Sequence, residues 1–207
     1  SFSCGPGNDV IGVGPSSVMI DTNYDNEIQV SEALAITYLD LDGYQGSMIS
    51  NLSGIEAFAN LQRLSCSNNL LTSLNLTQNQ GLRYLNCSNN PITSISAIQA
   101  PSLYELYCFN LPLITSIVIP PTNNLKRLEC GNYGNGSNPL STLSVSQAPN
   151  LLYLRCYNGI YTSLNLTQNT SLKGLDLTNV SLSSLNLDSN INLKSLSLYN
   201  VPLTSIS

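Results

Sequence analysis

Oxygen-bearing side chains recur at regular intervals in one acidic segment near the start of the chain. Counted from Asp21 as position 1, a carboxylate or amide oxygen stands at positions 1, 3, 5 and 12, and a backbone carbonyl can serve at position 7. Ca²⁺ is a hard cation that takes about six to eight oxygen ligands at this kind of spacing. The segment therefore predicts a calcium site, with Glu32 as the bidentate ligand, formed by Asp21, Asn23, Asp25, Glu27 and Glu32.

The same segment matches the calcium loop of an EF-hand, with a departure inside it and another before it. Position 6, normally Gly, is Asn26, which tolerates a left-handed backbone better than other non-glycine residues. Residues 31–36 can form a short helix after the loop, whereas the residues before it predict no helix. The alternative interpretation is an acidic turn that only resembles such a loop.

The composition excludes several classes of function. Only 9% of the residues are charged and the net charge is −5, with seven Lys and Arg residues scattered along the chain, which predicts no binding of nucleic acid or of an anionic membrane. The absence of His removes Ser–His and Cys–His pairs and the usual zinc sites. The neighbouring acids Asp40 and Asp42 have no flanking pocket residues. No stretch of about 18 apolar residues predicts a membrane span. We therefore predict that the chain is not an enzyme.

A Leu-x-x-Leu step recurs along most of the chain. After a degenerate copy at Ile36, it recurs at a nearly constant interval and begins at Leu61, Leu82, Leu103, Leu125, Leu151, Leu172 and Leu193. A period of this length indicates a solenoid, because each rung can bury its apolar side only against its neighbours. We predict a leucine-rich repeat solenoid, a right-handed stack of about eight rungs of about 21–26 residues. A parallel β-sheet would form its concave face, with short strands, 3₁₀ turns and extended turns on the convex face and little regular helix.

Two residue types occupy fixed positions in the rungs. Strand alternation predicts that Leu64, Cys66 and Asn68 face inward. The asparagines would form a structural column that satisfies backbone groups at the turn, namely Asn68, Asn89, Asn110, Asn132, Asn158, Asn179 and Asn200. The cysteines share a position that holds Leu in other rungs, which predicts a structural ladder of buried free thiols formed by Cys66, Cys87, Cys108, Cys130 and Cys156. Cys4 lies outside this ladder and could be free, lipidated or paired.

The outward positions of the strands change character along the stack. The middle rungs carry Tyr, Arg and acidic residues, a composition typical of binding hot spots, at Tyr84, Glu105, Tyr107, Phe109, Arg127, Glu129, Tyr153, Arg155 and Tyr157. The later rungs carry small or neutral residues, and the longest insertion, residues 131–139, would form a loop beside the middle rungs. We predict a ligand-binding face in these rungs. The alternative is an ordinary strand surface, on which Tyr is favoured by its β-propensity.

The rung sequences Leu64-Ser-Cys66-Ser-Asn-Asn69 and Leu85-Asn-Cys87-Ser-Asn-Asn90 resemble those of secreted or surface leucine-rich repeat proteins of bacteria, of the internalin type. The resemblance covers about residues 18–207. It implies a secreted or cell-surface bacterial protein, often exported by the type IX secretion route, with a role in adhesion and protein–protein interaction. In that subgroup an acidic loop such as residues 21–32 precedes the first regular rung. Because the sequence stops inside a rung, we expect further repeats or domains after Ser207.

These observations predict two regions with different roles. Residues 1–35 would form an N-terminal cap in which calcium pins the loop structurally, and residues 36–207 an incomplete repeat domain. We expect an extracellular binding or adhesion module that recognises a protein or a surface glycan through its concave Tyr- and Arg-rich face. A rigid calcium-capped spacer or cargo domain of a larger surface protein is one alternative. A subunit that adds rungs end to end is another.

Overall fold

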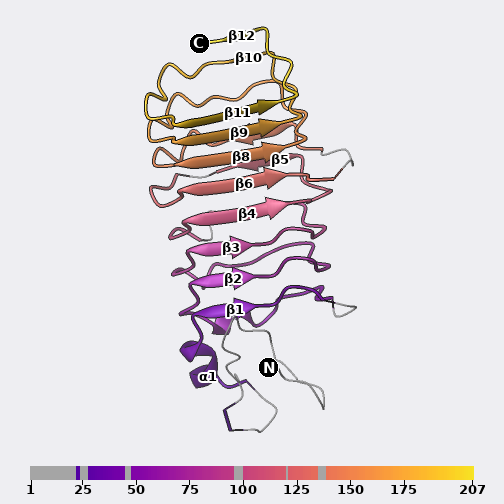
Figure 1. Cartoon of the computed structure of the whole chain (residues 1–207). Helices are drawn as coiled ribbons and strands as arrows, with labels where there is room; N and C mark the ends of the chain where they lie inside the picture. Colours follow the sequence, from indigo (N-terminus) through magenta and orange to yellow (C-terminus); the bar gives the residue numbers. More distant parts are fainter. Residues whose placement is uncertain (1–21, 24–27, 45–47, 96–99, 120, 135–138) are drawn as a thin grey trace.

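The chain winds into an elongated stack of parallel strands, with helix α1 (Val30–Ala35) at one end and the C-terminus at the other (Figure 1). The computed structural model describes residues 22–23, 28–44, 48–95, 100–119, 121–134 and 139–207. Each described rung contributes one strand to a common sheet and then returns along the opposite side. The solenoid predicted from the repeat is therefore confirmed.

The main sheet contains eight strands within the described residues, all parallel and in order along the chain. Neighbouring rungs pair without offset, so that Leu64 stands opposite Leu85 and Cys108 opposite Cys130. The pairing places equivalent repeat positions in straight columns that run along the stack. The strands are β1 (Tyr38–Asp40), β2 (Arg63–Ser65), β3 (Tyr84–Asn86), β4 (Glu105–Phe109), β6 (Arg127–Gly131), β8 (Tyr153–Tyr157), β9 (Gly174–Thr178) and β11 (Ser195–Tyr199).

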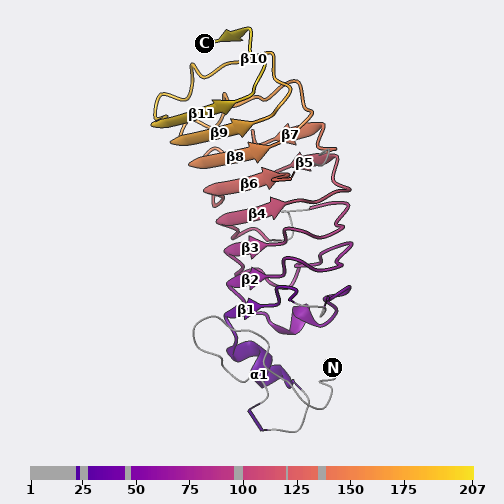
Figure 2. The same ribbon diagram turned by 45° about the vertical axis from the view of Figure 1, so that its right-hand side comes forward.

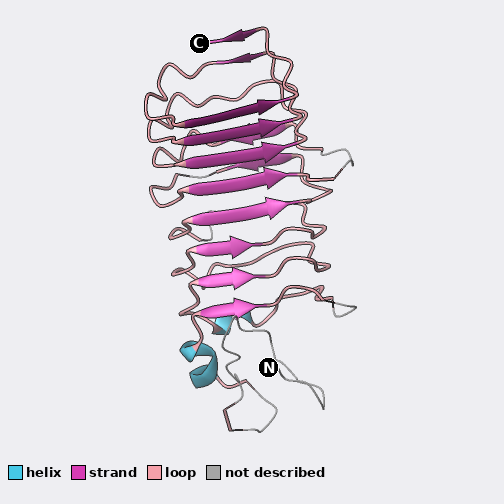
Figure 3. Ribbon diagram, in the orientation of Figure 1, coloured by secondary structure: helices cyan, strands magenta, loops and turns pink. Residues whose placement is uncertain are grey.

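The opposite side of the stack is less regular, as the sequence predicted. Two short pairs of parallel strands lie there, β5 (Ser116–Val118) with β7 (Thr142–Ser144) and β10 (Ser184–Leu185) with β12 (Ser205–Ile206) (Figure 2). The described residues otherwise form loops and turns, apart from α1 and the 3₁₀ helix η1 (Ile55–Ala57) (Figure 3). The segments between the strands hold many Ser, Thr, Asn and Pro residues, which favour turns over regular helix.

From β2 onward, the strands of the main sheet begin with the same pair of backbone hydrogen bonds. In the first pair of rungs, the backbone N–H groups of Gln62 and Arg63 both donate to the carbonyl of Thr37, at 2.8 and 3.0 Å. In the last pair, Lys194 and Ser195 both donate to Lys173, at 2.8 and 3.0 Å. Two consecutive residues thus oppose one residue of the neighbouring strand, as in a β-bulge, and the chain bends there. Both residues are exposed in these two rungs, although the Leu that precedes them in the repeat points toward the core.

Columns of apolar side chains fill the inside of the stack. The central leucines of the strands are buried from Leu39 to Leu175, with at most 3% of their surface exposed, whereas Leu196 in the last strand of the main sheet is 43% exposed. Burial against neighbouring rungs is therefore complete in the middle of the stack and incomplete at this end. Such apolar burial is the main stabilising contribution in a repeat protein.

The cysteine ladder is confirmed. All five predicted cysteines are buried free thiols in the same column. Three of them lie near a backbone carbonyl of the next rung, with Sγ–O distances of 3.5 Å for Cys66, 3.6 Å for Cys87 and 3.5 Å for Cys108. Burial raises the pKa of the Cys87 thiol to about 12. This thiol is therefore protonated at neutral pH and serves as a small apolar side chain.

The predicted inward position of the asparagine column is wrong. Six of its seven members adopt a left-handed backbone with φ between 50° and 56°, within three residues of the end of the strand. Their amides form a surface ladder, in which Asn89 Nδ2 donates to Asn68 Oδ1 at 2.9 Å and Asn179 Nδ2 to Asn158 Oδ1 at 2.8 Å. The left-handed residue ends the strand alternation, which is why these side chains are exposed or half-buried.

Other asparagines satisfy the buried backbone groups instead. Asn90, which follows the left-handed Asn89, is 1% exposed. Its Nδ2 donates to the carbonyls of Cys66, Cys87 and Ser88 at 2.9, 3.0 and 3.1 Å. Its Oδ1 accepts from the backbone N–H of Leu71 at 2.9 Å. The role predicted for the first asparagine of the Asn-Asn pair therefore belongs to the second in this rung.

Asn132 is the member of the column that departs from the left-handed turn. In its rung the positive φ, 100°, belongs to Gly131, one residue earlier. A Cβ atom at Gly131 would lie 2.1 Å from the carbonyl oxygen of Tyr157, so this position requires glycine. The amide ladder is interrupted at the same place, because Asn110 Oδ1 accepts from the backbone N–H of Tyr133 at 2.8 Å.

Candidate functional site

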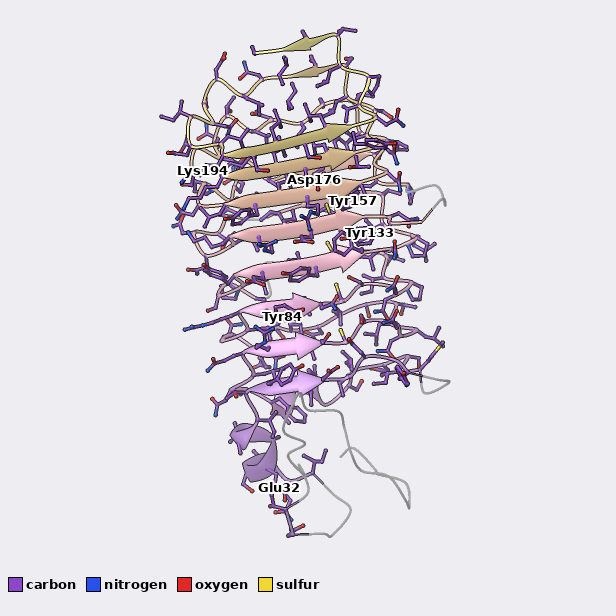
Figure 4. The ribbon with its side chains drawn as sticks, in the orientation of Figure 1. Glu32, Tyr84, Tyr133, Tyr157, Asp176 and Lys194 are labelled. Carbon is purple, nitrogen blue, oxygen red and sulfur yellow. The ribbon has the colours of Figure 1, made fainter. Side chains whose placement is uncertain are left out.

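The acidic segment lies next to α1. Asp21, Asp25 and Glu27 are outside the described residues, whereas Asn23 and Glu32 are described. Glu32 is in the first turn of α1, and its Oε2 accepts from the backbone N–H of Gln29 at 3.0 Å (Figure 4). Its Oε1 accepts from the backbone N–H and the hydroxyl of Thr22, at 2.6 and 2.7 Å. The carboxylate therefore joins both ends of the predicted loop.

The contacts of Glu32 fit a calcium loop and also explain the residue without a metal. Hydrogen bonds from the Gln29 backbone and from Thr22 lower the pKa of Glu32, so that an ionised carboxylate faces the loop, as position 12 requires. The same bonds cap α1, which is a common use of a Glu in the first turn of a helix. No cluster of three or more His, Cys, Asp or Glu residues suited to a metal lies within the described part of the chain. Calcium binding stays a prediction.

The predicted ligand-binding residues lie on the outer face of the main sheet, the side turned away from the core, which we call the sheet face. Burial along each strand alternates between leucine or cysteine inside and these residues outside, as in β8. Most of them are half-buried or exposed, but Phe109 and Glu129 are covered by neighbouring side chains. Their contacts form two groups, one ionic and one aromatic.

The ionic cluster consists of Arg127, Glu129, Arg155 and Asp176. The Glu129 side chain is only 7% exposed and accepts from Nη1 of Arg127 at 2.6 Å and from Nη1 of Arg155 at 3.3 Å. Arg155 Nε also donates to Asp176 Oδ2 at 3.2 Å, and the Tyr157 hydroxyl donates to the same oxygen at 3.2 Å. The hydrogen bond with Glu129 raises the pKa of Arg127. The cluster links β6, β8 and β9 through charge-assisted bonds that fix the side chains in place.

The aromatic cluster consists of Phe109, Tyr133 and Tyr157, and the two tyrosines lie toward the ends of the strands (Figure 4). The ring centroid of Tyr133 is 4.1 Å from that of Phe109 and 4.7 Å from that of Tyr157. Tyr133 is 55% exposed and comes from the longest insertion. Tyr133 is not among the site residues predicted from the sequence. The signal that could have found it is an aromatic residue in an insertion of Gly, Asn and Ser.

Cation–π contacts extend the site toward the N-terminal rungs. The guanidinium carbon of Arg63 lies 4.1 Å from the ring centroid of Tyr84, and that of Arg127 lies 4.8 Å from the ring centroid of Tyr153. Tyr84 in turn packs against Tyr107, with 5.3 Å between ring centroids. Sequence reasoning missed Arg63, because its partner belongs to the next rung and is distant along the chain. These contacts hold the aromatic rings in fixed orientations.

A hollow of about 230 Å³ opens beside the ionic cluster. The charged residues and Tyr153 line one part of it, and Gly174, Ser195 and Ser197 line another. The hollow exists because these small residues of the later rungs follow bulky side chains in the same columns. Tyr153 lies against Gly174, where an added Cβ would be 2.8 Å from the tyrosine Cδ1. The site thus combines a rigid rim with a small depression.

Solved structures with the same architecture belong to repeat proteins of bacteria and animals. The functional domain of InlJ from Listeria monocytogenes, described as including a cysteine ladder, has a TM-score of 0.67 and 27% identity over 87% of this chain and 43% of its own. Internalin C2 from the same species has a TM-score of 0.62 and 22% identity over 86% of this chain and 84% of its own. The chain folds as an internalin-like leucine-rich repeat solenoid. It spans less than half the length of the InlJ domain.

The resemblance beyond the internalins is one of fold. Human 5T4, also named Wnt-activated inhibitory factor 1, has a TM-score of 0.52 and 22% identity over 81% of this chain and 71% of its own. No protein-family model matches the sequence, and no curated protein matches it. Across the described part of this internalin-like chain, no helix is both long and apolar enough to cross a membrane.

Proposed function

We propose that this internalin-like chain is a non-enzymatic extracellular module that binds a protein partner through the sheet face of β4, β6, β8 and β9. The observation that supports this most is the convergence of the ionic cluster, the aromatic cluster and the hollow on these four strands and the adjoining β11 and Tyr133. The internalin-like neighbours support a protein-binding role in general terms. Recognition through this particular face is our proposal.

The physical properties of the face suit recognition. Tyr and Arg supply large contact areas and are enriched among residues that dominate binding energy. Their rings and guanidinium groups are already fixed by mutual contacts, so little side-chain entropy is lost when a partner orders them. Arg155 is 42% exposed despite its two ion pairs, and Tyr153 is 41% exposed. Both can therefore contact a partner without giving up their existing bonds.

A structural spacer is the second candidate. The acids and arginines of the ionic cluster satisfy one another, and the same contacts would stiffen a sheet that binds nothing. Surface ion pairs with this much exposure contribute little to stability, typically about 0–1 kcal/mol each, so stiffening alone is a weak reason to retain them. The concentration of aromatic residues beside them favours binding.

The proposal is tested with a pair of variants. Tyr133→Ala/Tyr153→Ala removes exposed rings from the proposed site, and Tyr44→Ala/Ile191→Ala removes exposed apolar side chains from positions outside the strands of the main sheet. Both variants and the unmodified chain are applied, in calcium, to a panel of extracellular proteins and polysaccharides. Binding of a protein that only the first variant loses, at an unchanged melting temperature, supports the proposal.

Other results of this experiment lead elsewhere. Binding that both variants retain supports the structural spacer instead. An absence of binding across a broad panel does the same. Binding only to polysaccharides, lost in the first variant, keeps the site but replaces the protein partner by a glycan.

The remaining expectations from the sequence are also proposals. Surface display in bacteria and export by the type IX route are supported by the Leu-x-Cys-Ser-Asn-Asn rungs at Leu64 and Leu85. A structural calcium ion beside α1 is supported by the ionised Glu32 that closes the loop. Extracellular calcium in the millimolar range would fill even a weak site of this type.

A further inference from the structure

The residues that lead into the strands of the main sheet form a column of their own. Their backbones are hydrogen-bonded in series, from Arg83 N to Gln62 O at 2.8 Å through to Lys194 N to Lys173 O at 2.8 Å. These bonds fix the register one residue before each strand begins. We call this set the leading column, and it consists of Gln62, Arg83, Tyr104, Lys126, Leu152, Lys173 and Lys194.

The leading column concentrates positive charge. The chain has seven Lys and Arg residues in all, and four of them, Arg83, Lys126, Lys173 and Lys194, stand in this one column. They look scattered in the sequence because one or two whole rungs separate each of them from the next. Since every separation is a whole number of rungs, the stack brings the four residues into line where the strands of the main sheet begin. The scattering of these residues along the sequence therefore hides a column of four cations in the stack.

These four cations have no ion-pair partners among the described residues. The ion pairs of the described chain are made by Arg127 and Arg155, which already occupy Glu129 and Asp176. Arg83, Lys173 and Lys194 are exposed, and Lys126 is half-buried. Figure 4 shows Lys194 where β11 begins, whereas Tyr133 and Tyr157 lie toward the other ends of the strands. The leading column therefore carries positive charge, although the net charge of the chain is −5.

The spacing of the cations allows their fields to add. Parallel strands lie about 4.8 Å apart, so Arg83 and Lys126 are about 10 Å apart, as are Lys126 and Lys173. This is close to the Debye length of about 10 Å at 0.1 M salt. From Arg83 to Lys194 the column is about 24 Å long, which an extended peptide of about seven or eight residues would span. A hollow of about 330 Å³ lies at its N-terminal end, lined by Gln62, Arg63, Arg83, Tyr84, Tyr104 and Glu105.

We propose that the leading column docks an acidic, extended segment of the protein partner, which lies along the axis of the solenoid. This inference rests on the proposed binding function and names the chemistry of the partner. An extended segment in the polyproline II conformation has three residues per turn and rises about 3.1 Å per residue, so carboxylates three residues apart would lie on one side, about 9 Å apart, and match the cations. A nucleic acid fits less well, because double-stranded DNA carries a charge about every 1.7 Å and would meet a chain of the same sign. Tyr104, which is 45% exposed, adds an aromatic contact between Arg83 and Lys126.

The experiment uses two labelled peptides of ten residues, one with Glu at every third position and one with Gln at the same positions. Anisotropy is measured with the full chain at 20 mM and at 150 mM salt. We expect the Glu peptide to bind more tightly than the Gln peptide at low salt, and to weaken as salt rises. The variant Lys126→Gln/Lys173→Gln/Lys194→Gln should bind the Glu peptide about tenfold more weakly, since three of the four cations are lost.

A control variant separates the column from the overall charge. Thr72→Glu/Thr162→Glu/Ser183→Glu changes exposed positions that lie outside the strands of the sheet face, and it lowers the net charge by the same three units. At 150 mM salt, where the Debye length is about 8 Å, its affinity for the Glu peptide should stay within about twofold of the unmodified chain, because its new charges lie outside the strands of the main sheet.

Three results would overturn the inference. One is that the Glu peptide binds no better than the Gln peptide, and another is that both triple variants lose affinity equally. The third is that single-stranded DNA or dextran sulfate binds more tightly than the Glu peptide and is lost in the lysine variant, which would make the column a general polyanion surface. The Tyr133→Ala/Tyr153→Ala variant retains the four cations, so failure of the proposed function is seen separately.

Discussion

Arg155 on β8 reaches back to Glu129 on β6, with 3.3 Å between Nη1 and Oε2, and so ties together two rungs separated by the longest insertion. Glu129 is nearly buried and also accepts from Arg127, so one carboxylate compensates two guanidinium groups. The repeat sequence carries this relationship only as isolated charges in neighbouring rungs. Stacking of the rungs brings the side chains of Glu129 and Arg155 into contact.

Glu129→Gln should destabilise the middle rungs. It keeps the shape of the side chain but leaves two arginines without their shared counter-charge, at a cost of about 1–2 kcal/mol after allowance for the exposure of both arginines. Urea unfolding would show the loss. Glu56→Gln, at an exposed position, is the control and should change the free energy of unfolding by less than about 0.5 kcal/mol. Equal effects of both substitutions would remove the special role of Glu129.

Gly131→Ala should be among the most damaging single changes in the chain. The backbone there has a φ of 100°, and the new Cβ would lie 2.1 Å from the Tyr157 carbonyl oxygen. Strain and displacement together should cost about 3 kcal/mol or more. Gly81→Ala is a matched control, because its nearest neighbour would be 3.7 Å away, and its stability should change by less than about 0.5 kcal/mol. Thermal unfolding of the two variants distinguishes these values.

Adjacent asparagines should differ strongly in their contribution to stability. Asn90→Ala removes a buried amide that serves three carbonyls and one N–H, and should cost about 2–4 kcal/mol. Asn89→Gly removes only the surface amide ladder at a left-handed position that glycine accepts, and should cost less than about 1 kcal/mol. Chemical denaturation measures both. A larger loss in the second variant would contradict the assignment of the buried role to Asn90.

The thiols of the cysteine ladder should not react with thiol reagents in the folded chain. In a Cys4→Ser background, maleimide should modify none of the five ladder thiols in the folded chain and all five after denaturation. Because the pKa of Cys87 is raised to about 12, its thiolate fraction stays small between about pH 7 and 9, and its slow labelling should rise about tenfold per pH unit over this range without levelling off. Cys87→Leu should cost less than about 1.5 kcal/mol, since leucine occupies the same column at Leu177. Rapid labelling of the native chain would show that the thiols are accessible.

Calcium should stabilise the N-terminal end through Glu32. We expect millimolar calcium to raise the melting temperature of the chain, and Glu32→Gln to abolish this rise. Without calcium, the lowered pKa of Glu32 predicts stability that is present above its ordinary value of 4.5 and lost as the pH falls through the lower folded value. Asp188→Asn, at an exposed acid of the opposite end, should leave the calcium response unchanged. An unmodified chain that does not respond to calcium would leave Glu32 as a helix cap alone.

Local sequence periodicity was sufficient to predict the solenoid, the parallel sheet and the cysteine ladder. A nearly constant repeat length returns the same apolar positions in every rung, and only stacking can bury them. The short helix after the acidic segment followed from similar local reasoning and is present as α1. Two-residue alternation also placed the predicted residues of the binding face outside the core, because that rule holds for as long as the strand continues.

The sequence could not show what happens where a strand ends or where two rungs meet. The asparagine column turned outward because a left-handed residue breaks the alternation, and no spacing rule marks that residue in advance. Tyr133, which no strand carries, joined Phe109 and Tyr157 through ring contacts across rungs. The four unpaired cations came together because contacts between rungs depend on distance in space, at about 4.8 Å per strand, and not on separation along the chain.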